Sequence, residues 1–355
     1  MQLTYILGNG FDIAIGLATG YSDFYKWYKK QPDESEEVSL LKETINKEIE
    51  KGNDNWKDFE YALGQFTAIV TDKKKYMECF QNARRSLIEY LKMVYAKGKA
   101  ENSDFLMSAT YQLVDRSQNS DSDLTGEYKL LFSTPKDAEM VFNCISFNYT
   151  PIFDEGKNEL ISNAQGISNA YGRPSKYEVG DILNVHGTLN DFPILGVDNV
   201  MQIANEAFRE DDEIVQMMVK GEIDKKLGYN WRREAIRIIE KSDKIYVYGA
   251  SLGDSDEFWW RTLAQWFEAD DQHELALYCH PEKNEAVMNS KIESFLDSIA
   301  KHFKDQNLKL KMAVDITEKN MKGKFAHMSA QSEIRLTTIA RLSVETVSER
   351  EENHN

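Results

Sequence analysis

The 355-residue sequence has little cysteine and no long apolar run, and each shortage argues against a class of protein. Its three cysteines, Cys79, Cys144 and Cys279, form no C-x-x-C pair, which argues against a cysteine-based zinc site and for a reducing compartment. No apolar stretch approaches the ~20 residues that span a bilayer. Met1-Gln2 lacks a basic n-region, and the first apolar run ends at Gly8, so no signal peptide is predicted. We therefore expect a cytoplasmic protein with no membrane partner.

Positive charge is also scarce. The chain has 43 Lys and Arg against 59 Asp and Glu, which gives a net charge of −16. Because nucleic-acid binding depends on cationic contacts to phosphates, we expect no nucleic-acid partner. No compact cluster of carboxylate and histidine ligands is visible in the sequence, so no metal is expected. The length and a hydrophobic content of 41% suit one large domain or a domain with an inserted one.

The N-terminus has the order strand, tight turn, helix. An apolar run over residues 3–7 stops at Gly8-Asn9-Gly10, and a helical pattern follows over residues 13–17. Glycine lets backbone N–H groups approach a phosphate, and the start of a helix favours negative charge. The complete G-x-G-x-x-G spacing is absent. The turn therefore predicts either a pyrophosphate site or only a connection between strand and helix.

Later strand-like segments also end on small or polar residues. In a parallel α/β sheet, ligands bind outside the carboxyl ends of the strands, so these residues predict one shared site. A further strand is predicted at residues 275–279, and an edge strand at 308–314. The three segments with polar ends are 141–147 before Asn148, 182–185 before His186, and 244–248 before Gly249-Ala250-Ser251.

A helical stretch separates the first two predicted strands. Trp56, Phe59, Leu63 and Phe66 recur at helical spacing, which is typical of a core or subunit-contact face. We predict an α/β nucleotide-binding core over residues 1–29 and 136–342, a helical insertion over 30–135 and a flexible tail over 343–355. Trp259-Trp260 in a later predicted helix is interpreted as core packing.

The ordered set of motifs resembles the AbiH-like family of phage abortive-infection proteins, from residue 3 to about residue 280. The motifs are Gly8-Asn9-Gly10-Phe11-Asp12, Gly16-Leu17-Ala18-Thr19-Gly20-Tyr21-Ser22-Asp23-Phe24, Trp56-Lys57-Asp58-Phe59-Glu60, Phe147-Asn148-Tyr149-Thr150, His186-Gly187 and Gly249-Ala250-Ser251-Leu252-Gly253-Asp254-Ser255-Asp256.

A more distant resemblance is to the sirtuin-like fold, which carries Gly-Ala-Gly, Asn-x-Asp, His-Gly and Gly-x-Ser in this order. Thr150 stands where that family has Asp, which puts recognition of the ribose hydroxyls in doubt, and the zinc-binding cysteines are missing. The second departure argues against a protein deacetylase and towards the sirtuin-like NAD hydrolases of phage defence. The resemblance implies a Rossmann-like parallel sheet with a large helical insertion after the first strand, and NAD as substrate.

The same resemblance implies roles for individual residues. Asn148 orients the ribose or the attacking water, and His186 acts as a base. The remaining cofactor-binding residues are Gly8, Asn9 and Gly10 at the pyrophosphate, Gly249 and Ser251 at phosphate or ribose, and Asp12 or Asp256 at a ribose hydroxyl.

Each role has a structural alternative. Asn148 can cap the following helix, Ser251 can be a turn residue, and Asp254 and Asp256 can be charges at a helix N-terminus. His186 can be a satisfied histidine beside the turn residue Gly187.

The shared site at the strand ends is compatible with three alternative functions. The first is hydrolysis of NAD to nicotinamide and ADP-ribose in abortive infection, held latent until a phage-derived trigger acts. The second is a non-catalytic module that senses a small-molecule nucleotide and works through partners or self-association, and the third is ADP-ribose transfer to another acceptor. The helical insertion is the expected place for homo-oligomer or sensor contacts.

Overall fold

All five strands predicted for the core form, and they pair in one parallel sheet. The computed structural model describes residues 1–52, 58–101, 139–160, 162, 176–250, 254–270, 273–278, 309–315 and 339–345. The parallel strands run in the order β3-β2-β1-β4-β5. They are β1 (Gln2–Leu7), β2 (Glu139–Ser146), β3 (Lys176–Asn184), β4 (Lys244–Tyr248) and β5 (Glu274–Tyr278).

The sheet order creates a switch point between β1 and β4. The chain continues from β1 to β2 on one side and from β4 to β5 on the other, so the crevice between β1 and β4 is where such sheets bind ligands. The prediction of a Rossmann-like parallel sheet is confirmed by this strand order. The predicted edge strand is confirmed as β6 (Lys309–Asp315), which pairs antiparallel with β7 (Ile339–Glu345).

Strand β7 corrects part of the predicted tail. It includes Ser343, Val344 and Glu345, which we expected to lie in a flexible tail over residues 343–355. The predicted start of the tail at residue 343 lies between Leu342 and Val344, which alternate with polar residues. Such alternation of apolar and polar residues is typical of a strand.

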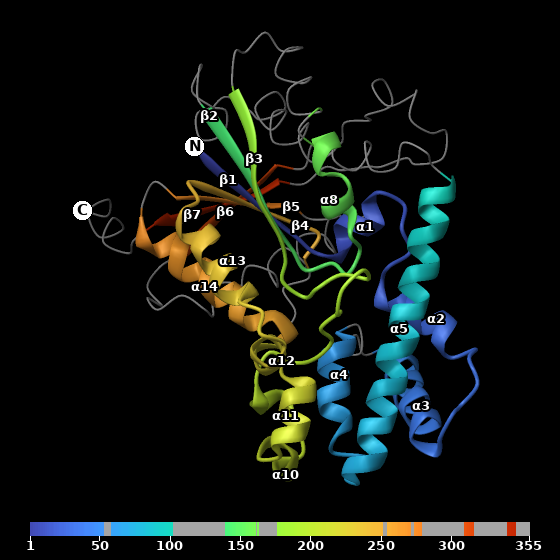
Figure 1. The fold of residues 1–355 in the computed structure, drawn as a ribbon. Helices are drawn as coiled ribbons and strands as arrows, with labels where there is room; N and C mark the ends of the chain where they lie inside the picture. Colours follow the sequence, from blue (N-terminus) through green and yellow to red (C-terminus); the bar gives the residue numbers. More distant parts are fainter. Residues whose placement is uncertain are drawn as a thin grey trace.

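Alternate residues of each strand pack on opposite faces of the sheet. Ile6 contacts a layer built from α13 (Trp231–Glu240) and α14 (Glu257–Ala269), and Tyr5 contacts the layer that contains α1 (Asn9–Ala14) and α8 (Ile152–Glu155). Figure 1 shows these helix layers on either side of the sheet. The prediction that Trp259 and Trp260 are core residues is confirmed, since both are buried.

The predicted helical stretch after the first strand is confirmed. It contains α2 (Tyr21–Tyr28), α3 (Glu36–Glu50), α4 (Phe59–Phe66) and α5 (Lys73–Glu101). Ser35 and Asp58 cap α3 and α4 by accepting a backbone hydrogen bond. Trp56 lies outside the described residues, and so do residues 105–114, for which the sequence also predicts a helix.

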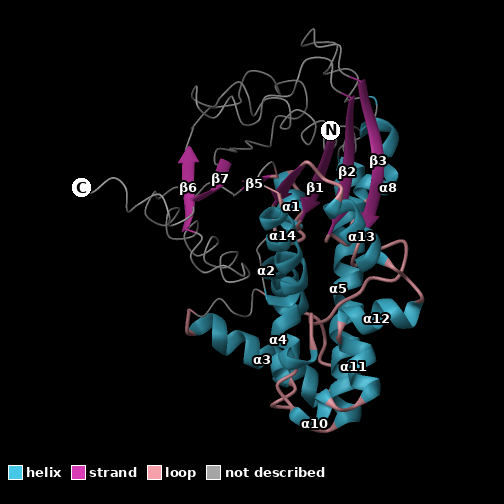
Figure 2. Ribbon diagram, turned by 90° about the vertical axis from the view of Figure 1, so that its left-hand side faces the viewer, coloured by secondary structure: helices cyan, strands magenta, loops and turns pink. Residues whose placement is uncertain are grey.

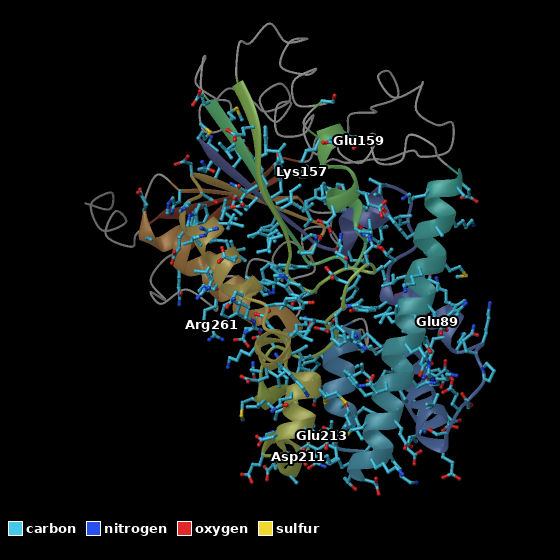
Figure 3. All side chains as sticks on the ribbon, in the orientation of Figure 1. Glu89, Lys157, Glu159, Asp211, Glu213 and Arg261 are labelled. Carbon is cyan, nitrogen blue, oxygen red and sulfur yellow. The ribbon has the colours of Figure 1, made fainter. Side chains whose placement is uncertain are left out.

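A second group of short helices packs beside this stretch. It comprises α10 (Glu206–Arg209), α11 (Asp212–Met218) and α12 (Lys220–Leu227). The pattern over residues 206–219 predicts a single helix, but the structure has two there because Asp211 caps α11. Lys73 of α5 lies 2.8 Å from both Asp211 and Glu213, which are labelled in Figure 3. Figures 1 and 2 place α3, α4, α10, α11 and α12, with most of α5, beyond the carboxyl ends of β1, β2 and β3.

The turn after β1 packs directly on the turn after β4. A Cβ added to Gly8 would lie 2.5 Å from the Cα of Ala250, and one added to Gly10 would lie 2.6 Å from the Cα of Gly249. Gly249 has φ +70°, and a Cβ there would lie 2.3 Å from the backbone N of Phe11. The glycines are therefore required by backbone contact between the two turns.

We predict that Gly249→Ala destabilises the protein more than Gly228→Ala. Gly228 has a similar φ of +72° but nothing within 4 Å of an added Cβ, so its substitution costs only about 1 kcal/mol of backbone strain. Gly249→Ala adds a clash with backbone atoms, and we expect a further loss of roughly 2 kcal/mol. Urea denaturation of both variants measures the difference, and equal losses would contradict the packing argument.

Candidate functional site at the carboxyl edge of the sheet

Asp12 of α1 is held at the end of β2 by two hydrogen bonds. The Asn148 Nδ2 group donates to Asp12 Oδ1 at 2.7 Å, and the Thr150 hydroxyl donates to Asp12 Oδ2 at 2.7 Å. The Asp12 residue is 1% exposed. Burial raises the pKa of the Asp12 carboxyl to about 7, although the bonds from Thr150 and Asn148 act in the opposite direction. This position therefore holds an acid that titrates near neutral pH.

The two polar atoms of the Asn148 side chain differ in their hydrogen bonding. Its Nδ2 group also donates to the Gly8 carbonyl at 3.1 Å. Its Oδ1 atom is buried and has no hydrogen-bond partner within the described part of the chain. Because Pro151, and not Asn148, stands at the N-cap position of α8, the interpretation of Asn148 as a helix cap is wrong. A buried acceptor without a donor is costly, so Asn148 Oδ1 is a position where a bound polar group would be stabilised.

His186 lies next to Asn148 because β2 and β3 are in register. Ser146 of β2 pairs with Asn184 of β3, and the two site residues each follow by two positions. The His186 ring stacks on Phe147 at 5.4 Å between centroids and lies 6.4 Å from the Tyr149 ring. Both neighbours of Asn148 in the sequence therefore contact the imidazole, which is 4% exposed.

His186 faces Asp256 from the segment after β4. The imidazole Nε2 lies 3.2 Å from Asp256 Oδ1. That distance is within ion-pair range, but the orientation of the two groups does not meet hydrogen-bond geometry. If Nε2 carries the proton that faces the carboxylate, Nδ1 has the lone pair. Asp256 stands at the N-cap position of α14 but makes no side-chain capping bond there, so its carboxylate serves the side-chain cluster instead.

The same Asp256 oxygen contacts a buried lysine. Lys220 Nζ lies 2.7 Å from Asp256 Oδ1, 2.5 Å from Glu60 Oε2 and 3.0 Å from the Ser255 carbonyl. The Tyr149 hydroxyl donates to the other Glu60 oxygen at 2.6 Å. We call Glu60, Lys220, Asp256 and His186 the buried charge cluster.

Opposite charges dominate the ionisation of this cluster. Burial raises the pKa of Asp256, but Lys220 and His186 outweigh it and hold the pKa below its usual range. Burial lowers the pKa of Lys220, but Asp256 and Glu60 outweigh it and raise the pKa above its usual range. Lys220 and Asp256 are therefore ionised throughout the physiological pH range.

The glycine turns contribute backbone contacts. The Gly8 N–H donates to the Tyr248 carbonyl at 2.9 Å, and the Gly10 N–H donates to the Gly249 carbonyl at 2.8 Å. The Asn9 side chain accepts a bond from the Thr19 hydroxyl. The predicted pyrophosphate role of Gly8, Asn9 and Gly10 and the cofactor-binding role of Gly249 therefore stay predictions, because these contacts explain the glycines without a ligand. Ser251 lies outside the described residues.

Sequence reasoning missed Glu60 and Lys220 as members of the site. Glu60 was visible as the last residue of the Trp-Lys-Asp-Phe-Glu motif, which was interpreted only as part of a family pattern. Lys220 has no motif around it, and nothing in its local sequence indicates that it is buried.

Neither a metal cluster nor a membrane helix is found in the part of the chain that the structure describes. There, no group of three or more His, Cys, Asp or Glu side chains is arranged to hold a metal ion. No described helix is both long enough and apolar enough to cross a bilayer.

The site lies inside a stretch that matches a known family. A family profile described as bacteriophage abortive infection AbiH matches residues 4–278, from β1 to the end of β5. The chain belongs to the AbiH family. This membership assigns it a role in abortive infection against bacteriophage. The AbiH match includes Asp12, Asn148 and the whole buried charge cluster, whereas β6 and β7 lie beyond it. No curated protein is matched by the sequence.

The raised pKa of Asp12 predicts how stability depends on pH. An unfolded Asp ionises near its ordinary value, whereas folded Asp12 keeps its proton up to about pH 7. Folding is therefore penalised as the pH rises from about 4 to 7, by roughly 3 to 4 kcal/mol in total. We expect Asp12→Asn, which cannot ionise, to gain stability relative to the natural protein over this range.

Urea denaturation at a series of pH values measures the effect, with Glu240→Gln at an exposed carboxylate as the control. A constant difference between Asp12→Asn and the natural protein from pH 4 to 8 would contradict the raised pKa.

Proposed function

We propose that this AbiH protein hydrolyses NAD to nicotinamide and ADP-ribose, and that loss of NAD is how it aborts infection. The observation that carries the proposal is the pairing of Asn148 and His186 at the ends of neighbouring strands. One has a buried acceptor without a partner in the described part of the chain, and the other is a histidine whose Nε2 lies 3.2 Å from a carboxylate oxygen of Asp256. An amide that binds and an imidazole that accepts a proton are the groups that hydrolysis of a glycosidic bond requires.

The reaction needs little covalent assistance from the protein. The bond between C1′ of the ribose and the nicotinamide nitrogen breaks, and its electron pair neutralises the pyridinium. The resulting oxocarbenium-like centre is attacked by water. The water oxygen forms the new bond to C1′, and its proton passes to His186. Nδ1 is the nitrogen that can accept this proton when Nε2 faces Asp256.

Asn148 is suited to orient the ribose or the water. Its fixed Nδ2 group, tied to Gly8 and Asp12, leaves Oδ1 as the acceptor for a hydroxyl of the substrate. Holding the reacting groups in place is a large part of catalysis when the leaving group is already good.

Asp12 offers a reason for the absence of an acid at position 150. The carboxylate of Asp12 lies 2.7 Å from the Thr150 hydroxyl. A second carboxylate at position 150 would face Asp12 at close range, and two such acids cannot both ionise readily. We propose that Asp12 supplies the carboxylate that the sirtuin-like pattern places two residues after the Asn, so ribose recognition does not require Asp at 150.

We predict that His186→Ala and Asn148→Ala lose nicotinamide release from NAD. Removal of a general base typically lowers turnover on the order of 10²- to 10⁴-fold, and we expect a loss in this range for His186→Ala. Nicotinamide release from purified protein is measured by chromatography, alone and with lysate of phage-infected cells, because the activity is expected to need a trigger.

The control is Asn46→Ala, the same side-chain change at an exposed position of α3. Retained NAD binding without nicotinamide release under any condition would favour the sensing module instead. Label from ADP-ribose-labelled NAD that stays covalently attached to protein or nucleic acid would favour transfer.

A further inference from the structure

One buried ammonium is shared between two carboxylates, and only one of them reaches the histidine. Lys220 Nζ contacts Glu60 Oε2 and Asp256 Oδ1, and His186 Nε2 lies 3.2 Å from the same Asp256 oxygen. Lys220 and His186 therefore compete for one carboxylate oxygen. Counted by formal charge, the two acidic side chains and the one lysine sum to −1 beside the imidazole.

The cluster is largely buried, and its most exposed member is Asp256, whose side chain is 19% exposed. Lys220 and Glu60 are each 3% exposed, so the ion pairs are screened much less than pairs on the surface. The charged and titratable groups that face the cluster come from every element around it. They are Tyr21 of α2, Asp58 before α4, Tyr149 after β2, Asp198 after β3 and Arg232 of α13.

Two of these neighbours largely cancel each other. Arg232 lies 2.9 Å from Asp198, so this pair adds little net charge. Tyr21 and Tyr149 stay neutral, because burial and nearby carboxylates such as Glu60 raise the pKa of each phenol well above its usual range. Asp58 is the remaining charged neighbour, and burial raises its pKa as well. The balance at His186 is therefore governed mainly by Lys220, Glu60 and Asp256.

We propose that Lys220 and Glu60 are positioning residues that set how strongly Asp256 holds the His186 imidazole and therefore how readily the imidazole takes up a proton. Glu60 is part of α4 in the helical stretch, whereas Asp256 and His186 follow strands of the core. The helical stretch thus acts on the histidine through a charge. The catalytic consequence rests on the proposed NAD hydrolysis, but the electrostatic coupling does not.

The formal charges predict that Lys220→Met and Glu60→Gln shift the protonation of His186 in opposite directions. Lys220→Met leaves two carboxylates without their cation and frees the shared Asp256 oxygen, which favours the imidazolium. Glu60→Gln removes one negative charge and leaves Lys220 wholly to Asp256, which disfavours the imidazolium. The double variant Lys220→Met/Glu60→Gln restores the formal charge of −1.

The experiment follows the ring protons of His186 by NMR as a function of pH, with His186→Gln to assign its signal among the six histidines. We expect the titration midpoint to rise by about one pH unit or more in Lys220→Met, to fall in Glu60→Gln, and to return towards the natural value in the double variant. Lys220→Arg keeps the charge and should leave the midpoint nearly unchanged.

Matched controls are Lys225→Met and Glu222→Gln, an ion pair at 2.6 Å on the more exposed side of the same helix. These should leave the midpoint in place because solvent screens them. Midpoints that do not move, or that move in the same direction in both single variants, overturn the proposal. If Lys220→Met does not fold by circular dichroism, the fall in Glu60→Gln and its reversal in the double variant decide the question.

Activity separates this proposal from the proposed function. In a hydrolase, the acidic limb of the pH profile of kcat/KM should move with the NMR midpoint in each variant. Opposite NMR shifts without any nicotinamide release would support the coupling and reject NAD hydrolysis. Nicotinamide release with an acidic limb that Lys220→Met and Glu60→Gln do not move in opposite directions would support hydrolysis and reject the coupling.

Discussion

The site depends on one ammonium buried between two carboxylates. Lys220 joins α12 to Glu60 of the helical stretch and to Asp256 of the core. Loss of one partner from such a buried ion pair typically costs about 3 to 5 kcal/mol, so the arrangement fixes three segments that are distant in sequence. Within this buried charge cluster His186 faces Asp256, and Tyr149 contacts the cluster from outside by donating a hydrogen bond to Glu60. The buried charge cluster thus connects these three segments and also sets the electrostatic environment of His186.

A second constraint acts at the switch point of the sheet. The turns after β1 and β4 touch backbone to backbone, which fixes where α1 begins. Asp12 of α1 is thereby carried to the end of β2, where Asn148 and Thr150 donate to it. The register of β2 with β3 then sets Asn148 beside His186. Sheet geometry therefore assembles the acid, the amide and the imidazole, and the AbiH family match covers all of these elements.

Much of the fold could be predicted because its signals are local. Apolar runs located all five core strands, and the spacing of Phe59, Leu63 and Phe66 located α4. Two boundaries predicted from the sequence were wrong, and each error also had a local cause. Residues 206–219 form two helices where the pattern predicts one, because the Asp211 side chain accepts backbone hydrogen bonds at the start of α11. The boundary of the predicted tail cut into β7, because the last apolar alternation is short.

The strands, the order of the motifs and the candidates Asn148 and His186 could all be found from local patterns, because hydrophobic period and turn chemistry act between near neighbours. Packing of the whole chain determines that Asn148 donates a hydrogen bond to Asp12 and does not cap a helix. Packing also brings Lys220 onto Asp256, which faces His186, and brings Glu60 onto Lys220. Charges interact through space, and their strength depends on burial and distance. Residues far apart in the chain become buried and come close together only when the helical stretch packs against the carboxyl edge of the sheet.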